Sequence, residues 1–335
     1  MASEIESLLE YVVNVGGSEL IVTEGASAAV RFSGRVCSVP DAPVTEFGAL
    51  REFLGSLEGD SGSIICGPFA NCKWRVRYFR EAMGNAAIFR PLMSECPEFT
   101  SFGFPQSVES LLALKSGLVV FAGPSCSGKT TSSTSFVSSL CNSRILRACF
   151  LDEFPEIPVN SGESLLLKDT QGTVSDKINQ ALLSGCDLIW MGDFSPENLF
   201  PMLKACEAGA IVVCTVTAGN SSGVLDSLVS SVESSSRDLA RSLLAAALKA
   251  VIVQRLLPSA SEGGGAVPAF EVLLNTQNVA SLVRNGEFFK IPSILASCSA
   301  DGMLLMDDSL VQLVKAGYVA EEEALKYVSN PARLG

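Results

Sequence analysis

The 335-residue sequence predicts an α/β protein of two domains, with helices toward the C-terminus. Three observations support this fold class. Short β-rich runs occupy the first hundred residues, and apolar strands alternate with helical stretches from residue 104 onward. A glycine-rich loop also joins one of these strands directly to a helix. The hydrophobic content of 47% is ample for a buried core.

Residues 1–98 are expected to form a small α+β domain. The segment SEIESLLEYVVNV begins with Ser3 as a candidate N-cap, spaces its apolar residues at helical intervals from Ile5 to Val12, and ends before Gly16. Short β-rich runs separated by Gly, Pro and Asn follow it, namely SELIVTEG, AAVRFSGRV, GSIICGP, KWRVRYFRE and AAIFRPL.

Residues 104–335 show the alternation typical of a parallel sheet with crossover helices. The apolar strand Leu118–Ala122 ends on the glycine-rich loop, and further strands are expected at ACFLDE, CDLIWMGD and AIVVCTVTA. From about residue 222 to 335 the sequence indicates a mainly helical region, through RDLARSLLAAALKAVIVQRLL, NVASLVRNG and DSLVQLVKAG.

Composition excludes several classes of protein. The 24 Lys and Arg against 36 Asp and Glu, a net charge of −12, argue against a nucleic-acid surface. No apolar run approaches the ~20 residues that cross a bilayer, so we expect a cytoplasmic protein. The eleven cysteines include no CxxC pair and are expected to be reduced, small hydrophobic residues, with disulfides or a zinc site as the alternatives. Histidine, the commonest general base, is absent.

The segment GPSCSGKTT, residues 123–131, matches the pattern G-x-x-x-x-G-K-[ST] in full. A chance match is the alternative, but the segment closes an apolar strand and opens a helix, as the motif requires. Backbone N–H groups would bind phosphates, Lys129 would neutralise the β and γ oxygens, and Thr130 would offer its hydroxyl to Mg²⁺. The predicted site for ATP and Mg²⁺ consists of Gly123, Pro124, Ser125, Cys126, Ser127, Gly128, Lys129, Thr130 and Thr131.

Two predicted strands end in acidic residues. CFLDEFPE places Asp152 and Glu153 after one strand, and DLIWMGD places Asp193 at the end of another. An acid at the end of a strand beside a phosphate loop is placed to act on the metal and on the attacking water. We predict Asp193 as a catalytic residue and Mg²⁺ ligand, supported by Asp152 and Glu153. The alternative for each of these residues is that it is a solvated acid at the end of a strand, without a role in catalysis.

The order of these motifs resembles that of the PilT-type retraction ATPases of type IV pili, within the secretion ATPase superfamily. The resemblance covers nearly the whole chain, through GGSELIV, WRVRYFREAMGNAAIFRPL, the phosphate loop, FLDEFPE, CDLIWMGD, AIVVCTVTAGNS, LLAAALKAVIVQRLL, VASLVRNG and DGMLLMDDSLVQLVKAG. The related assembly ATPases of pili and type II secretion are less similar, since the chain lacks their longer N-terminal region and four-cysteine zinc motif.

This resemblance implies a PAS-like N-terminal domain at residues 1–98 and a RecA-like domain at residues 104–335. It further implies a ring-shaped homo-hexamer that binds ATP between subunits and drives pilus retraction at the cytoplasmic face of the inner membrane. Arg75 and Arg90 match family arginines that reach the nucleotide from the N-terminal domain. Because the chain is acidic, we expect it to meet the membrane through an inner-membrane platform protein rather than through lipid.

The chain departs from the family pattern at catalytic positions. Asp193 and Asp152 stand where the family has glutamates, and a shorter side chain on a fixed backbone displaces the carboxylate. Thr217 stands at the position of the His-box histidine. Other family positions are replaced at Ala210, Leu183, Ser195, Met83, Ala280 and Ser281. These replacements motivate a second hypothesis, an ATP-binding accessory subunit with impaired catalysis that regulates an active paralogous ATPase.

Two further arginines follow Arg75 in the same predicted strand and could replace a missing family arginine. In a strand with a period of two, Arg77 shares the face of Arg75, whereas Arg80 lies on the other face unless a bulge intervenes. Arg77 is therefore a candidate replacement, with a solvated or interface arginine as the alternative.

Overall fold

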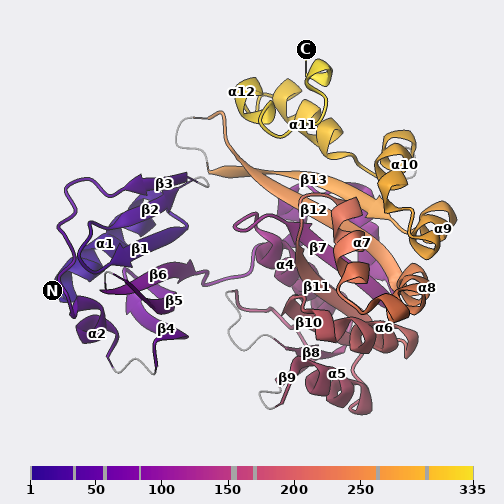
Figure 1. Ribbon diagram of the computed structural model, residues 1–335, viewed down its shortest axis with the longest axis horizontal. Coiled ribbons are helices and arrows are strands. Elements are labelled where there is room, and N and C mark those ends of the chain that lie inside the picture. The colour runs from indigo at the N-terminus through magenta and orange to yellow at the C-terminus, as the bar shows by residue number, and fades with distance from the viewer. Residues whose placement is uncertain are drawn as a thin grey trace. The chain divides into compact units, whose positions relative to one another are not determined.

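The computed structural model describes residues 2–32, 35–55, 59–82, 84–151, 157–168, 172–261, 265–298 and 302–334. The chain divides into two compact units, one formed by residues 1–95 and 156–158 and the other by the remainder (Figure 1). Each unit has its own sheet. Among the described residues, no helix combines the length and the apolar character needed to cross a membrane.

The first unit is built on a six-stranded antiparallel sheet with the order β3-β2-β1-β6-β5-β4. Its elements are α1 (Ala2–Val15), β1 (Glu19–Thr23), β2 (Ala29–Phe32), β3 (Arg35–Ser38), α2 (Ala49–Leu54), β4 (Ser61–Phe69), β5 (Cys72–Glu81) and β6 (Gly84–Leu92). The strands follow the predicted runs closely. Helix α1 begins at Ala2, so the prediction of Ser3 as its N-cap is wrong. Errors of one or two residues are typical at helix boundaries.

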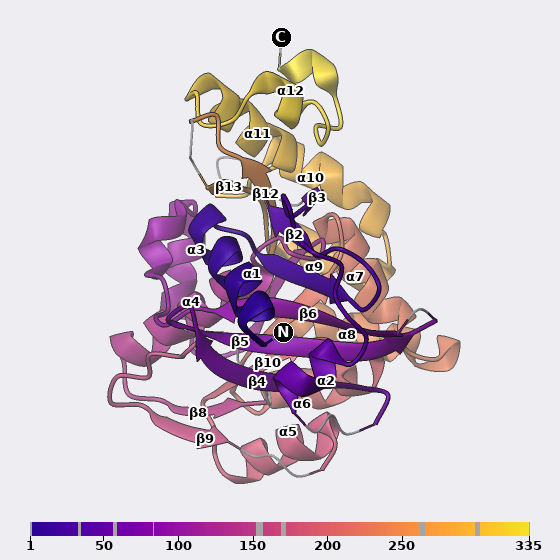
Figure 2. The same ribbon diagram turned by 90° about the vertical axis from the view of Figure 1, so that its left-hand side faces the viewer.

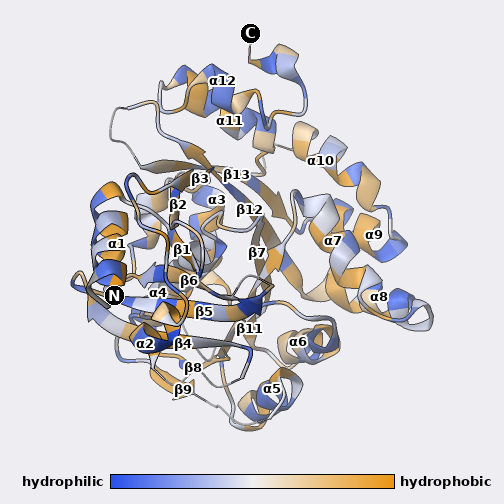
Figure 3. Ribbon diagram, turned by 60° about the vertical axis from the view of Figure 1, so that its left-hand side comes forward, coloured by the Kyte–Doolittle hydropathy of each residue, from blue (hydrophilic) through white to orange (hydrophobic). Residues whose placement is uncertain are grey.

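One face of this sheet is apolar and covered by helices. Leu9 and Val12 of α1 are fully buried against Trp74 and Val76 of β5, and Figure 2 shows α1 lying across the sheet. In Figure 3, hydrophobic and hydrophilic residues alternate around the turns of α1, as expected for a helix with one buried side. Because side chains alternate along a strand, Arg75 is directed to the opposite face.

The second unit is built on a seven-stranded sheet with the order β13-β12-β7-β11-β10-β8-β9. Its strands are β7 (Gly117–Gly123), β8 (Arg147–Phe150), β9 (Leu165–Lys168), β10 (Leu188–Asp193), β11 (Ile211–Thr217), β12 (Leu248–Pro258) and β13 (Ala266–Leu274). All neighbours pair in parallel except β13, which is antiparallel to β12. The carboxyl ends of the parallel strands therefore meet at one edge of the sheet.

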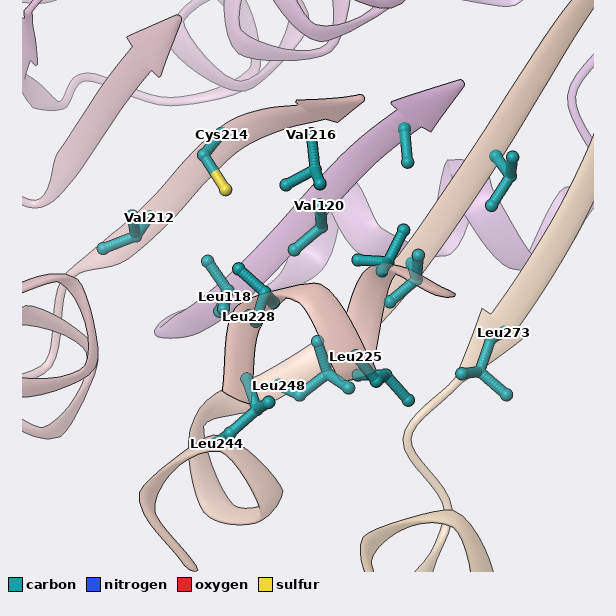
Figure 4. Packing of buried hydrophobic residues seen from close by; sticks show 14 of the residues in the cluster. Leu118, Val120, Val212, Cys214, Val216, Leu225, Leu228, Leu244, Leu248 and Leu273 are labelled. Atoms are coloured by element: carbon teal, nitrogen blue, oxygen red, sulfur yellow. The ribbon is translucent and has the colours of Figure 1, made fainter. Parts of the chain in front are cut away.

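Helices cover both faces of the seven-stranded sheet. They are α3 (Gln106–Glu109), α4 (Lys129–Ser143), α5 (Val174–Leu183), α6 (Leu199–Glu207), α7 (Ser221–Ser230), α8 (Arg237–Ala247), α9 (Gln277–Asn285), α10 (Ile291–Ser297), α11 (Met306–Lys315) and α12 (Glu321–Ala324). Helix α4 and its Phe136 pack on one face. On the other face, Leu118 of β7 and Cys214 of β11 belong to one buried hydrophobic cluster that also includes residues of α7 and α8 (Figure 4).

The expectation of a mainly helical region from about residue 222 is wrong for β12 and β13. Helix α8 ends at Ala247, and the chain continues as an eleven-residue strand through AVIVQ. This run is buried on both sides of the sheet, so its apolar residues are continuous rather than alternating. Periodicity alone cannot distinguish such a strand from a buried helix, which explains the error.

Five cysteines, Cys141, Cys149, Cys186, Cys206 and Cys214, are buried in the second unit. Burial raises the pKa of the Cys206 thiol to about 12, although the nearby Lys249 lowers it. A thiol with so high a pKa stays protonated and unreactive at neutral pH. The burial of all five indicates that they act as small hydrophobic side chains.

Candidate functional site

The glycine-rich loop connects the buried strand β7 to the N-terminus of α4 and depends on unusual backbone angles. Gly123, Cys126 and Gly128 have φ values of 151°, 61° and 82°. A Cβ atom at Gly123 would lie 2.2 Å from the backbone oxygen of Gln254, and one at Gly128 would lie 2.7 Å from its Nε2 atom. Both glycines are thus required by conformation and by close contact with β12.

Two polar groups lie inside this loop. Lys129 is 8% exposed, and its Nζ atom donates a 2.9 Å hydrogen bond to the carbonyl oxygen of Pro124. Ser127 is 3% exposed, and among the described residues its Oγ atom has no hydrogen-bond partner. A buried hydroxyl without a partner is costly unless a ligand accepts its proton. A phosphate oxygen is such an acceptor, so the loop fits a phosphate group.

The first turn of α4 completes the loop. Thr130 and Thr131 are half-buried in this turn, where the backbone N–H groups have no partners within the helix. Helix α4 therefore directs the N–H groups of its first turn and the positive end of its dipole toward the loop. Pro124 is half-buried, while Ser125 and Cys126 are exposed at the loop's tip.

A buried polar contact ties this loop to β12. The Oγ atom of Ser132 donates a 2.6 Å hydrogen bond to Oε1 of Gln254, and both side chains are at most 2% exposed. Gln254 thus supports α4 through its amide and approaches Gly123 through its backbone oxygen. Sequence analysis missed this residue because its segment was interpreted as helix. The sequence signal that could have identified Gln254 was a single amide side chain within an otherwise apolar run.

Asp193 is the last residue of β10 and lies at the same sheet edge as the loop. Its carboxylate is exposed and accepts a 2.8 Å hydrogen bond from the hydroxyl of Thr215, a buried residue of β11. Thr217, two residues further along β11, is exposed and pairs in register with Gly123 of β7. Strand β11 lies between β7 and β10, so Thr217 stands between the loop and the strand of Asp193.

Two predicted site residues cannot be placed. Asp152 and Glu153 follow β8 but lie outside the described residues, as does Met83. Their predicted roles stay predictions. Elsewhere in the described chain, no group of three or more Cys, Asp or Glu side chains is arranged to hold a metal ion.

The first unit contains a separate cluster of cations, on the face of its sheet opposite α1. Arg75 of β5 and Arg90 of β6 are paired in register, and both line a small cavity of about 30 Å³ together with Arg77 and Ile88. The arrangement confirms that Arg75 and Arg77 share a face.

Glu19 of β1 holds part of this cluster in place. Its carboxylate accepts hydrogen bonds of 2.7 Å from Nε of Arg31 and 2.7 Å from Nε of Arg90. Burial alone would raise the pKa of Glu19, but the hydrogen bonds and charges of the two arginines outweigh it and lower that pKa below the usual value. Sequence analysis missed Glu19, whose only signal was an acid within an apolar strand.

A phosphate loop between a buried strand and a helix, on a largely parallel sheet, defines the class of P-loop proteins. Within that class, the model of the Type II/IV secretion system protein family matches residues 93–287. This match spans more than half of the chain, which therefore belongs to the Type II/IV secretion system protein family.

Individual proteins agree with this assignment. A twitching motility protein of Neisseria gonorrhoeae is 28% identical over 263 residues, which are 77% of this chain and 70% of that protein. The type IV pilus ATPase PilU of Pseudomonas aeruginosa is 24% identical over 341 residues, 98% of this chain and 89% of that protein. The crystal structure of the pilus retraction motor PilT with bound ADP superposes with a TM-score of 0.79 at 23% identity, covering 98% of both chains. The resemblance to PilT-type proteins is confirmed, as is the α/β fold class.

Proposed function

We propose that this protein is an ATP-hydrolysing motor subunit for type IV pilus retraction or a related filament or secretion system. The observation that carries the proposal is the interior of the loop, where Lys129 and the unpartnered hydroxyl of Ser127 are buried in a cradle of two required glycines. The relatives add support, since one is an ATPase of type IV pili and one is a retraction motor that binds ADP.

The residues of the site have separate roles in this proposal. Residues 123–131 bind the phosphates of ATP through backbone N–H groups, and Lys129 neutralises the β and γ oxygens. Thr130 and Asp193 hold Mg²⁺, which when bound with ATP neutralises charge on the transferred phosphate. Asp193 also orients the attacking water, and the hydroxyl of Thr215 holds the Asp193 carboxylate in place. Asp152 and Glu153 support Asp193 in this role.

The two units have separate roles in the proposed assembly. The antiparallel sheet with helices on one face supports a PAS-like domain at residues 1–98, and the parallel sheet with its phosphate loop supports a RecA-like domain at residues 104–335. Six copies form a ring in the cytoplasm, and Arg75 and Arg90 of one copy act on ATP bound by another. An inner-membrane platform protein links this acidic ring, of net charge −12 per chain, to the membrane.

The proposal is tested by steady-state ATP turnover of the purified protein and of two variants. We expect Lys129→Ala and Asp193→Asn each to reduce turnover by at least ~100-fold. Lys115→Ala, which changes an exposed lysine before β7, serves as the control and retains the wild-type rate. Equal rates for the wild type and Lys129→Ala would overturn the proposal.

A second candidate function is an ATP-binding accessory subunit that regulates an active paralogous ATPase. It is favoured by the pairing of Thr217, a residue without an ionisable side chain, opposite Gly123, and by the short carboxylate arm of Asp193. This candidate predicts tight ATP binding without turnover and a changed rate when the protein is mixed with an active paralogue. Turnover in the range of ~1–100 s⁻¹ by the isolated protein would remove it.

A further inference from the structure

Trp190 is a fully buried residue of β10 to which the proposed function gives no role. Its indole Nε1 atom donates a 3.3 Å hydrogen bond to Oγ of Ser133, which is equally buried in α4. The Ser133 hydroxyl in turn donates a 3.1 Å hydrogen bond to the carbonyl oxygen of Thr130, in the first turn of the same helix. A chain of two hydrogen bonds thus connects β10 to the residue of α4 that is proposed to bind Mg²⁺.

Trp190 also lies directly before an irregularity in β10. It pairs with Val213 of β11, and both residues belong to the hydrophobic cluster that includes residues of α4. Asp193 is three positions further along β10, but it pairs with Thr215, only two positions beyond Val213. The extra residue in β10 forms a bulge, which changes the side to which the following side chain points. Because Thr215 and Val213 share a face, the bulge turns Asp193 toward the face covered by α4.

The end of β8 meets the same tryptophan. The carbonyl oxygen of Trp190 accepts a 2.9 Å hydrogen bond from the backbone N–H of Leu151, and the centroid of its ring lies 5.7 Å from that of Phe150. Asp152 follows Leu151 directly in the sequence. The three segments that carry the proposed metal-binding and water-orienting residues, namely α4, β10 and the end of β8, therefore meet at Trp190.

Binding of Mg²⁺ requires a constant spacing between these segments. The ion demands near-octahedral geometry with short bonds to oxygen, so two ligands on separate elements bind it well only when their separation is fixed. Thr130 is on α4 and Asp193 is on β10. Burial of apolar side chains is not directional and does not by itself fix a helix at one position along a strand. The buried indole N–H is a directional donor, so its bond to Ser133 supplies this restraint.

We infer that Trp190 is a positioning residue for the Mg²⁺ that is bound with the nucleotide. Through Ser133 it holds the first turn of α4, and with it Thr130, in one position relative to Asp193. Trp190 acts through Ser133 and through its own strand, because its side chain is fully buried. This inference rests on the proposed function, since the phosphate loop must bind ATP together with Mg²⁺.

Calorimetric binding of a non-hydrolysable ATP analogue to the full-length protein, with and without Mg²⁺, tests this inference without requiring turnover. Trp190→Phe and Ser133→Ala each remove one partner of the bond. We expect each variant to need about tenfold more Mg²⁺ than the wild type for half of the gain in analogue affinity that Mg²⁺ produces. Affinity measured in the absence of Mg²⁺ is expected to stay unchanged, because the phosphate loop itself is not altered.

Trp74→Phe is the matched control and is expected to behave as the wild type. Trp74 is equally buried, and its Nε1 atom donates a 3.0 Å hydrogen bond to the carbonyl oxygen of Phe69 in the first unit. The double variant Trp190→Phe with Ser133→Ala is expected to lose no more than the more affected single variant, since both substitutions remove the same bond. Ser133→Ala, which removes a single oxygen atom, carries the test if Trp190→Phe does not fold.

Three results would overturn the inference. They are an unchanged Mg²⁺ requirement in Ser133→Ala, an equal loss of analogue affinity with and without Mg²⁺, and additive losses in the double variant. The second result would indicate that Trp190 and Ser133 only stabilise the fold. Failure of the proposed function is distinct, because the wild type would then bind no analogue at any concentration of Mg²⁺.

Discussion

Thr215 donates a 2.8 Å hydrogen bond to Asp193, although the two residues lie on neighbouring strands and 22 positions apart in the sequence. The strands β10 and β11 shift their register between Trp190 and Asp193, and this shift places the carboxylate opposite the hydroxyl. The bond restrains an exposed acid at the edge where the phosphate loop also ends. A buried residue thus controls the direction of the proposed catalytic carboxylate.

Thr215→Val tests this control, because valine has the shape of threonine without the hydroxyl. We expect kcat for ATP hydrolysis to fall about 10- to 100-fold, since the freed carboxylate no longer orients water. KM is expected to change little, because the phosphate loop is unaltered. Steady-state kinetics of the variant beside Thr215→Ser, which keeps the hydroxyl, provides the measurement. A normal kcat for Thr215→Val would show that the hydrogen bond does not position the acid.

Gly123→Ala is predicted to disrupt the loop. The new methyl group would lie 2.2 Å from the backbone oxygen of Gln254, at a φ of 151° that other residues rarely adopt. The strain of ~1–3 kcal/mol must be relieved by moving the loop, so nucleotide affinity falls by tenfold or more. Gly265→Ala, at an open position before β13, is the matched control. Calorimetric titration with ADP compares the two, and similar affinities would contradict the prediction.

The contact between Gln254 and Ser132 is predicted to stabilise the fold as a pair. Gln254→Leu leaves the Ser132 hydroxyl buried without its partner, which costs ~1–3 kcal/mol of unfolding free energy. Adding Ser132→Ala removes the unsatisfied hydroxyl and should restore part of the loss. Denaturant unfolding of the two single variants and the double variant completes a double-mutant cycle. Additive effects of the two substitutions would indicate that the bond is not formed.

The stability of the second unit is predicted to depend on the ionisation of Glu271 on β13. This residue is 5% exposed, and its Oε1 atom accepts hydrogen bonds from the backbone N–H and the hydroxyl of Ser221 at the start of α7. Burial raises the pKa of Glu271, and the nearby Asp307 raises it further, against the lowering effect of Ser221. The folded protein therefore binds the proton more tightly than the unfolded chain does.

The protonation of Glu271 therefore contributes to the stability of the folded unit. This contribution is present below the unfolded pKa of about 4.5 and is lost as pH rises through the folded pKa. Glu271→Gln keeps a neutral acceptor for both bonds at every pH. We expect its melting temperature to exceed that of the wild type increasingly as pH rises from about 4.5 to 8. Thermal unfolding across this range measures the effect, with Glu321→Gln on the exposed α12 as control. Parallel curves would contradict the prediction.

Prediction from sequence succeeded where a structural feature is contiguous along the chain. The strand, loop and helix from Leu118 to Thr131 are one continuous segment whose glycine spacing suffices to specify a phosphate cradle. The alternation in β5 likewise predicted that Arg75 and Arg77 share a face, because the period of two is a local property. Prediction failed for β12, where burial on both faces removes that alternation.

The sequence by itself thus determined the fold class, the family and the phosphate loop, because each depends on local patterns or on their order along the chain. Only the tertiary structure decided which distant residues meet at the sites. The strand orders place Gln254 beside Gly123, Thr215 beside Asp193, and Glu19 beside Arg90. Such pairings follow from strand order and register, which are set by how each sheet as a whole buries its apolar side chains and not by any one segment.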